Sequence, residues 1–494
     1  MSAGRHQSDE EPKVIKLKVM IDKTRNRVIF AESDHEFIDT LFSFLTLPLG
    51  TVLRLLEKDM VQLGSISRVY ASVYSLDPRF LRTSYCKSML IMPRNSSEVQ
   101  CEKLKLNVDH SEIAGKLFVC SDYYPCNNLF SISQNTRCCL CDNLMRFPKR
   151  IYDKEEKRSS GEGSVVEVFL KGGAASFMVT DDLQVMPAST ASLTALFGKL
   201  GVSDKNEIEA KTVEVGIKEG NWVKHTSKFE NNQTAKLEKK AMSQNSNSMS
   251  LKLIVSKSNK KVLYAEAGVK LVDFLFSFLA FPLGAVVKHL GGNSRLGCID
   301  NLYKAAADLS SENYMKSEEC KNMLLSPKLF PHSGFDSHIL QVGEEYPKYR
   351  YGFGGLEIVG DTNKSEGSSI GYEEKTSDLV VASESIESEE AASNFAIIMD
   401  PKSPTGETIK GEGYLKGPAT FMILDNLLVT PFSPTSIITQ LNQMNVSPSD
   451  VEERTVIVGK DEALNLLKAS LISKTVLNDV FNIREPYPKV MLKV

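Results

Sequence analysis

An internal repeat constrains the fold of this chain more than any other feature of its sequence. When the 494-residue chain is aligned with itself at an offset of 234 positions, residues 17–56 match residues 251–290 without a gap. The two segments share 17 identities in 40 positions. Self-similarity of this kind is typical of a structural unit that occurs more than once. We therefore predict two tandem copies of one long unit.

The match resumes further along each copy, so the repeated unit is long. The stretch FMVTDDLQVMP at residues 177–187 aligns with FMILDNLLVTP at residues 421–431. The later stretch TVEVG at residues 212–216 aligns with TVIVG at residues 455–459. The order of these blocks is the same in both copies, which indicates that each copy has the same arrangement of elements.

These matches divide the chain into five segments. Repeat unit 1 is expected over residues 13–226 and repeat unit 2 over residues 249–494. Residues 1–12 are predicted to be disordered, and the polar stretch 227–248 is predicted to be a flexible linker. Unit 2 also contains an acidic insertion at residues 361–394, with nine acidic residues and eight serines. So biased a stretch buries too little apolar surface to become ordered, so we predict disorder there.

Each copy begins with a pattern that predicts a β-hairpin followed by a helix. The stretches LKVMI and RVIFAE alternate apolar and polar residues around a polar turn. Apolar residues from Phe37 to Leu45 then recur at helical spacing, and Pro48 ends the helix. The later block repeats this order, with a turn at Asp181 and a Ser/Thr-capped helix through Leu196. The prediction is an α+β fold of β-hairpin-plus-helix, β-grasp-like blocks.

The two copies are predicted to differ at their ends. After TVIVG, copy two continues into a helix with Ala463, Leu467 and Leu471 on one face. The aligned stretch of copy one, GIKEGNWVKH, lacks that pattern. We infer that the C-terminal helix closes one end of the molecule.

Several of these motifs resemble a known family. They are the opening KLKV, the AE followed by F-x-D-x-L-F-S-F-L-x-x-P-L-G, the FMVTDDL hairpin and the closing DEALNLLKASLISKTVL. Together they are similar to a land-plant family catalogued as domain of unknown function 674, and the resemblance covers nearly the whole chain. It implies no particular activity, substrate or catalytic residue. Copy two departs from the family by lacking its cysteine-rich segment, so metal binding is not expected there.

A cluster of cysteines in copy one is the best candidate site. Five of the nine cysteines fall within 22 residues, in the stretch CSDYYPCNNLFSISQNTRCCLC. Four thiolates on two short turns can close a tetrahedral zinc shell, and Cys138-x2-Cys141 has the usual ligand spacing. We predict a structural zinc in a zinc-ribbon-like insert, held by Cys120, Cys126, Cys138 and Cys141, with Cys139 as the alternative to Cys138. The competing interpretation is a cluster of thiols packed as small hydrophobic groups, and a disulfide or redox role remains a third.

Other chemistry-bearing residues favour structural roles. His110 precedes the cluster and is a weaker candidate to replace one cysteine. Asp39 and Asp273 lie at equivalent positions inside apolar helices, where a carboxylate needs a partner, so we expect each to hold a structural hydrogen bond. The sequence contains no HExxH, GxSxG, phosphate-loop or kinase motif.

Charge and hydropathy exclude several classes of protein. A net charge of −3 gives no global field for nucleic acid or an anionic membrane. The apolar stretch at residues 271–287 contains Asp273 and Pro282, so a buried helix is expected rather than a membrane span. Because the N-terminus has no secretory signal pattern, we expect an intracellular protein of the cytoplasm or nucleus.

The leading functional hypothesis is a non-enzymatic module that binds other proteins through sheet edges or helix faces. The alternative is a zinc-ribbon-like nucleic-acid-binding protein, for which copy one would need a basic face. An enzyme without a recognisable motif is the third hypothesis. The sequence leaves the partner and the oligomeric state open.

Overall fold

The computed structural model covers most of both copies. It describes residues 13–57, 62–121, 126, 129–152, 166–173, 175–201, 208–216, 248–335, 338–345, 349–350, 379–381, 396–403 and 412–481. The segment predicted as a disordered N-terminus, all but the last residue of the predicted linker, and most of the acidic insertion lie outside these residues.

Each copy contributes one five-stranded antiparallel sheet. The sheet of copy one has the order β7-β6-β2-β1-β8, and that of copy two has the equivalent order β15-β14-β10-β9-β16. The strands of the first sheet are β1 (Val14–Asp22), β2 (Arg27–Ser33), β6 (Phe177–Val179), β7 (Val185–Pro187) and β8 (Ile208–Gly216). The strands of the second are β9 (Met249–Ser256), β10 (Val262–Gly268), β14 (Thr420–Leu424), β15 (Val429–Pro431) and β16 (Val451–Val458).

The predicted hairpin-plus-helix blocks are present in both copies. A helix follows each hairpin, and a serine caps the helix after the second hairpin of each copy: Ser189 Oγ accepts from the Ser192 N–H, and Ser433 Oγ from the Ser436 N–H. The closing strand of each sheet lies at its edge, beside β1 or β9, rather than between the two hairpins. The structure therefore supports the mixed α and β class and the block order, and no finer fold name follows from it.

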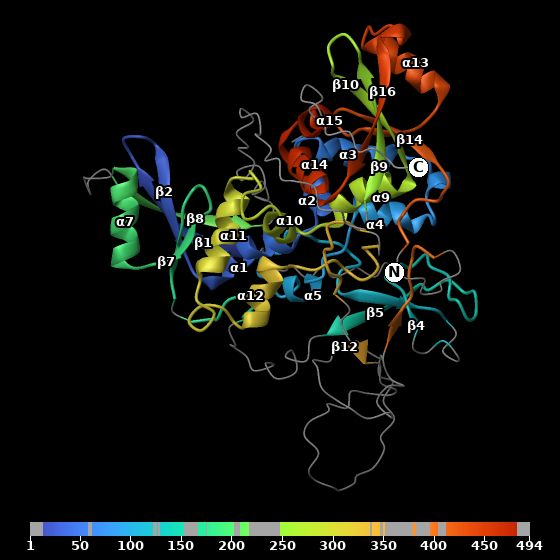
Figure 1. The fold of residues 1–494 in the computed structure, drawn as a ribbon. Coiled ribbons are helices and arrows are strands. Elements are labelled where there is room, and N and C mark those ends of the chain that lie inside the picture. The colour runs from blue at the N-terminus through green and yellow to red at the C-terminus, as the bar shows by residue number, and fades with distance from the viewer. Residues whose placement is uncertain are drawn as a thin grey trace, which may run out of the picture.

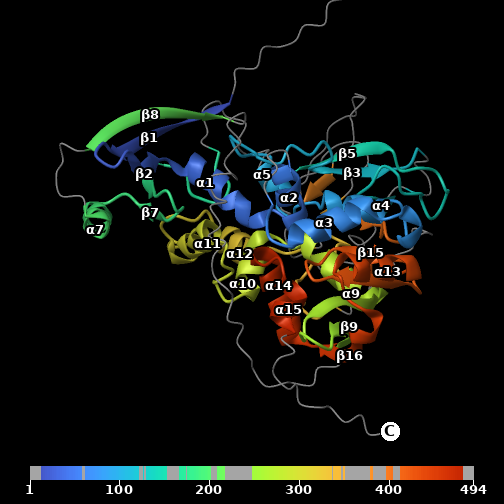
Figure 2. The same cartoon turned by 90° about the horizontal axis from the view of Figure 1, so that it is seen from above.

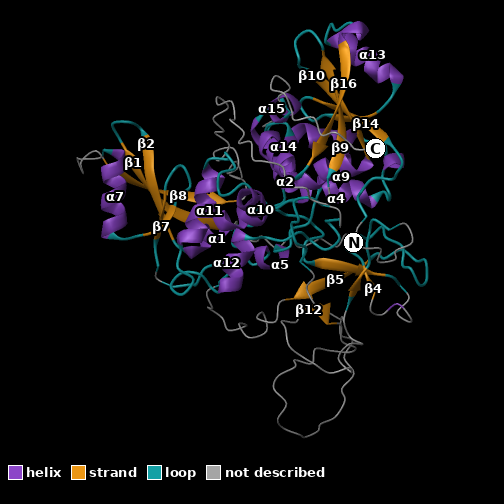
Figure 3. Cartoon of the chain, in the orientation of Figure 1, coloured by secondary structure: helices purple, strands orange, loops and turns teal. Residues whose placement is uncertain are grey.

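Helices fill the space between the two sheets, which lie at opposite ends of the molecule (Figures 2 and 3). Those of copy one are α1 (His35–Ser43), η1 (Phe44–Thr46), α2 (Leu49–Glu57), α3 (Ile66–Ser75), η2 (Pro78–Phe80), α4 (Tyr85–Ile91), α5 (Glu98–Cys101) and α7 (Thr190–Leu200). Those of copy two are α9 (Val269–Ser277), η6 (Phe278–Ala280), α10 (Leu283–His289), α11 (Cys298–Asp308), α12 (Glu318–Leu325), α13 (Pro434–Gln443), η8 (Pro448–Asp450), α14 (Lys460–Ile472) and α15 (Val476–Val480).

The two copies are related by an approximate twofold axis that passes near two equivalent prolines. Pro48 and Pro282, which align in the repeat, form an antiparallel bridge with each other. Around them the Leu49 N–H donates to Phe281 O (2.9 Å), and the Leu283 N–H donates to Leu47 O (3.0 Å). A contact between equivalent residues that is repeated in both directions is the mark of a self-complementary, twofold interface.

Each copy packs its helices against the sheet of the other. Helix α3 of copy one contacts β15 and α9 of copy two, and helix α11 of copy two contacts β7 and α1 of copy one. A single hydrophobic cluster includes buried residues of both sheets and of the helices between them. The tandem copies thus share one core, which the repeat alone does not predict.

The apolar stretch at residues 271–287 is buried in this core, as expected. It forms α9, η6 and α10, with the break at Phe281 and Pro282. Among the described residues, no helix has the length and apolar character needed to cross a membrane.

Strands from both copies also join in two smaller sheets, at the bottom of Figure 1. One has the order β11-β12-β5-β3 and the other pairs β13 with β4. The strands of copy one are β3 (Lys116–Val119), β4 (Leu129–Phe130) and β5 (Phe147–Tyr152), and those of copy two are β11 (Tyr349–Arg350), β12 (Leu379–Val381) and β13 (Ile397–Ile398). Strand β12 belongs to the acidic insertion, so the prediction of disorder does not hold for these three residues. These residues, Leu-Val-Val, have a high β-propensity, and they pair with β5.

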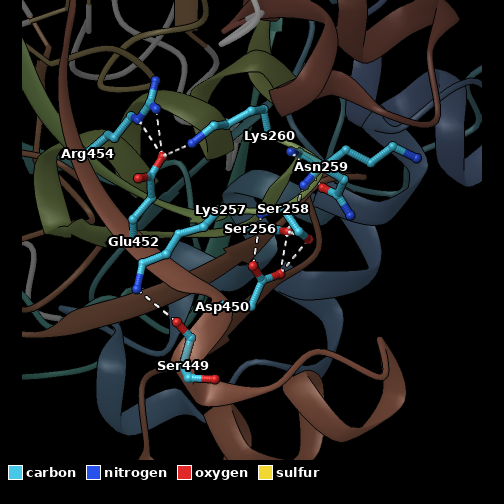
Figure 4. Close-up of polar contacts among 10 residues, drawn as sticks. Ser256, Lys257, Ser258, Asn259, Lys260, Ser449, Asp450, Glu452 and Arg454 are labelled. Atoms are coloured by element: carbon cyan, nitrogen blue, oxygen red, sulfur yellow. Dashed lines mark hydrogen bonds and ion pairs between the residues drawn. The ribbon is translucent and has the colours of Figure 1, made fainter.

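The tips of the first hairpins are held by a carboxylate in both copies, but from different positions. In copy one, Asp22 accepts hydrogen bonds from the Thr24 and Arg25 N–H groups. In copy two, Ser256 stands at the equivalent position, and Asp450 from η8 accepts from Ser256 Oγ (2.7 Å) and the Ser258 N–H (2.8 Å) (Figure 4). The turn chemistry is thus kept while its carboxylate comes from elsewhere in the chain.

Candidate metal centre

The four predicted cysteines converge on one point in copy one. The sulfur atoms of Cys120, Cys126, Cys138 and Cys141 all lie within 4.8 Å of one another. Cys120, Cys126 and Cys138 are buried and Cys141 is half-buried. The structure therefore brings together the residues that the spacing singled out.

Strand β3 and one short turn position three of these side chains. Cys120 directly follows β3, whose Phe118 exchanges two 2.8 Å main-chain hydrogen bonds with Ser131, just after β4. The turn that carries Cys138 and Cys141 is closed by the Cys138 N–H, which donates to Asn143 O (2.9 Å), and by the Asp142 N–H, which donates to Cys138 O (2.9 Å). A turn with two cysteines at this spacing is usual in structural zinc sites.

The surroundings of the cluster are apolar and come from both copies. Phe118, Leu129 and Met145 of copy one pack around the cysteines, together with Met399 of copy two. Met399 is held there because its N–H donates to Phe130 O (2.8 Å) next to the parallel pair β4 and β13. The cysteine loop therefore lies at a junction between the copies.

The thiol pKa values in the cluster shift in different directions, because burial raises them and hydrogen bonds can lower them. Desolvation raises the pKa of Cys120 to about 11 and raises that of Cys126 further above its usual range. Burial also opposes ionisation of Cys138, but hydrogen bonds from the Cys141 and Leu140 main chain, with those from neighbouring thiols, outweigh it and lower its pKa. Of Cys120, Cys126 and Cys138, Cys138 is therefore the one that most readily becomes a thiolate, the form that binds metal.

The donor set fits a closed tetrahedral zinc site. Zinc–sulfur bonds of about 2.3 Å place tetrahedral sulfur atoms about 3.8 Å apart, and no two of these sulfur atoms are more than 4.8 Å apart. Four thiolates would leave no coordination position for water, so such a zinc would stabilise the fold rather than act on a substrate.

The other predicted ligands lie outside the cluster. Cys139, the alternative to Cys138, is exposed, and so is His110. None of the nine cysteines, all of which are among the described residues, is in a disulfide.

Asp39 and Asp273 accept hydrogen bonds from main-chain N–H groups, which agrees with the structural role that their apolar surroundings indicated. Asp39 accepts from the Phe169 (3.1 Å) and Leu170 (2.9 Å) N–H groups. Asp273 accepts from the N–H groups of Tyr414 (2.9 Å) and Leu415 (3.0 Å), at the equivalent place in copy two. Burial raises the pKa of each carboxyl to about 7, against those hydrogen bonds.

A buried serine and histidine lie 2.6 Å apart but cannot form a nucleophile and base. Nδ1 of His338 accepts from the Leu340 N–H (3.1 Å), so Nε2 carries the proton and donates to Ser277 Oγ. The Ser277 hydroxyl in turn donates to Phe274 O. Burial lowers the pKa of His338 to about 3, so the ring stays neutral. The pair is a structural bridge within the core.

A second buried polar group ties loops of copy two together. Lys402 Nζ donates to Gly334 O (2.5 Å), and the hydroxyl of Tyr414 donates to Ser333 O. His332 Nε2 lies 2.9 Å from Ile398 O. Sequence analysis did not identify this group, because its members are far apart in the chain and fit no motif.

A cavity of about 560 Å³ lies where β7 of copy one meets α11 of copy two. Val185, Met186 and Tyr314 line it, together with Lys199 and Lys304. Sequence analysis did not predict it, since its two walls belong to different copies.

Comparison with known proteins identifies one family. The model of a family described as protein of unknown function (DUF674) matches residues 11–221 and again residues 218–461. No curated protein and no solved structure matches the chain. The two matched segments correspond to the two copies of the repeat.

Proposed function

Because the chain belongs to the DUF674 family, whose name assigns no chemistry, we propose a function from its own geometry. The protein is a non-enzymatic protein-interaction module whose first copy is stabilised by a structural Zn²⁺. The metal part of the proposal is supported by four converging thiols in an apolar setting. The non-enzymatic part is supported by the structural hydrogen bonds of the buried residues that could otherwise serve in catalysis, Asp39, Asp273, Ser277 and His338.

The observation that carries the interaction part is a difference in burial between equivalent residues of the two sheets. Val262 at the start of β10 is 4% exposed, whereas Val28 at the start of β2 is 38% exposed. Val19 and Ile21 of copy one are half-buried, whereas their counterparts Leu253 and Val255 are fully buried. An apolar surface that the same unit covers in one copy and leaves open in the other is suited to bind a partner.

Reconstitution with purified components tests this function. Proteins retained by the immobilised full chain from an extract, with and without nuclease treatment, are identified, purified and titrated against the chain. We expect at least one to bind directly and stoichiometrically. Retention that disappears with nuclease treatment, or a small-molecule substrate turned over by the chain, would contradict the proposal.

A zinc-ribbon-like nucleic-acid-binding protein is the second candidate, favoured by one feature of the cysteine loop. Phe147, which is 53% exposed, follows the exposed Arg146 directly after that loop. An exposed aromatic ring beside a cation can stack on a base. This candidate predicts affinity for single-stranded nucleic acid that falls steeply with salt and is lost in Phe147→Ala.

A further inference from the structure

Two C-terminal helices cover the apolar face of the second sheet. Helix α15 contacts β10, and α14 contacts β16 and α15. Leu467 and Leu477 of these helices are buried in the same cluster as Val255 and Val262 of the sheet. In Figure 1, α14 and α15 lie beside the second sheet and next to α3 of copy one.

Hydrogen bonds also fix the position of these two helices. The side chain of Asn478 accepts from the Val262 N–H (2.9 Å) and donates to Val262 O (3.0 Å). Its Nδ2 also donates to Asp425 at the β14–β15 turn (2.8 Å). At the other end, Ser65 Oγ donates to Ser473 O (2.6 Å).

A close approach of main chain completes the fit. A Cβ added at Gly64, just before α3, would lie 2.4 Å from Leu471 O. Only glycine therefore allows the end of α14 to lie against the start of α3. Gly64 also has a positive φ of 48°, which glycine tolerates best.

The equivalent surface of copy one has a counterpart for each of these residues but, in the part of the chain that the structure describes, lacks the helices. Val28 replaces Val262, Asp181 replaces Asp425, and Cys298 replaces Ser65. Gly297, before α11, has a positive φ like Gly64 (53°), but a Cβ added there would meet nothing within 4 Å. Among the described residues of the chain, none fills the place that α14 and α15 occupy on copy two.

We propose that this surface of copy one, formed by Val19, Ile21, Val28, Asp181 and the start of α11, is a docking site for a helix of another protein. The inference rests on the proposed interaction function and specifies its partner. The partner segment is an amphipathic helix like α14, with leucine and alanine on one face, followed by a short turn and an asparagine. That asparagine would contact the main chain of Val28 and the carboxylate of Asp181, as Asn478 does on copy two.

A separate protein is a better occupant than a second copy of this chain. To donate its own α14 and α15, a second copy would have to expose Leu467, Leu477 and Phe481, which are at most 1% exposed. It would also break the hydrogen bonds of Asn478. A helix from another protein carries neither cost.

The chain itself supplies the probe for a test. A fluorescently labelled peptide of residues 459–481 is titrated with the full-length protein, and its anisotropy is measured. We expect saturable one-to-one binding that Val28→Arg weakens about tenfold or more, the loss typical of a central contact. Ile438→Arg, at a 60% exposed position on α13, is the matched control and should leave binding unchanged.

Three outcomes would overturn the docking site. They are no binding of the peptide, binding that is indifferent to Val28→Arg because the peptide replaces α14 on copy two, and a concentration-dependent dimer of the chain that Val28→Arg dissociates. A second peptide with Leu467→Asp and Leu477→Asp should not bind. If the peptide fails while purified partners still bind the chain, this docking site is wrong and the interaction function stands. If the peptide binds and no protein partner exists, the surface can hold a helix, but the interaction function and the partner assigned to this surface are wrong.

Discussion

In each copy, one buried carboxylate joins two segments that are far apart in the sequence. Asp39 and Asp273 each accept main-chain hydrogen bonds from a segment more than a hundred residues away in sequence. The sequence predicted that these side chains would need a partner, because they lie among phenylalanines and leucines. It could not identify which main chain they hold, since that depends on how distant segments pack.

Replacing Asp39 or Asp273 by asparagine should destabilise the protein. An amide would turn its NH₂ group toward at least one of the main-chain N–H donors, which costs about 1 to 3 kcal/mol per unsatisfied group. Equilibrium denaturation measures the loss, and the two variants should behave alike because the sites are equivalent. A free energy of unfolding unchanged in both would contradict the structural role.

The pH dependence of this loss has a definite sign. Burial raises the pKa of both carboxyls from 3.8 to about 7, so the folded state holds the proton more tightly than the unfolded chain. The stability each contributes is complete below about pH 4 and falls as the pH rises through 7. The advantage of the wild type over Asp39→Asn should therefore narrow between these values.

Asp450 should show the opposite pH dependence. Hydrogen bonds from the side chains of Ser256 and Ser258 lower its pKa below 3.8, so its contribution is present at neutral pH and lost as the pH falls through the folded-state pKa. We expect Asp450→Asn to be less stable than the wild type at pH 7 and to approach it in acid. A constant difference across this range would contradict the role of Asp450 in the β9–β10 turn.

At the scale of elements, local patterns predicted well and contacts between copies did not. The hairpins, the serine caps of α7 and α13, the helix break at Pro48 and the C-terminal α14 all follow from alternation, capping residues and proline chemistry. The cysteine spacing identified the four residues that converge. The contribution of Met399 to their surroundings, and the pairing of β12 with β5, arise from segments hundreds of residues apart and have no local signal.

The pair Gly64 and Gly297 tests the packing of α14. Alanine at either position is strained by the positive φ, which L side chains rarely adopt. Only at Gly64 does the added Cβ also collide with main chain, at Leu471 O. Gly64→Ala should therefore lower the free energy of unfolding more than Gly297→Ala does. Equal losses in the two variants would show that α14 does not lie against α3.

At the scale of the molecule, the two copies share one core, and their sheets differ because, among the described residues, C-terminal helices cover only the second. The bridge between Pro48 and Pro282 and the exchange of helices between sheets give the copies a shared core. The sequence predicted two copies of equal architecture. It gave no sign that each would complete the other, because equivalent residues in contact leave no pattern in a single chain.

Cutting the chain between its copies should leave them together. A protease site inserted near residue 240, within the predicted linker, allows the folded protein to be cleaved into two fragments. Because α3 and α11 each pack on the other copy, we expect the fragments to co-elute in size-exclusion chromatography and to unfold in one transition. Separation into two folded fragments would contradict a shared core.

The most direct test of the account is the zinc content of the purified full chain. Because only copy one has the cysteine cluster, we expect one zinc per chain rather than two. Cys126→Ser, which removes a ligand, should abolish it, and Cys139→Ser, at an exposed neighbouring position, should retain it. Protein prepared without chelator that holds no zinc, or Cys126→Ser protein that holds as much as the wild type, would contradict a structural zinc in copy one.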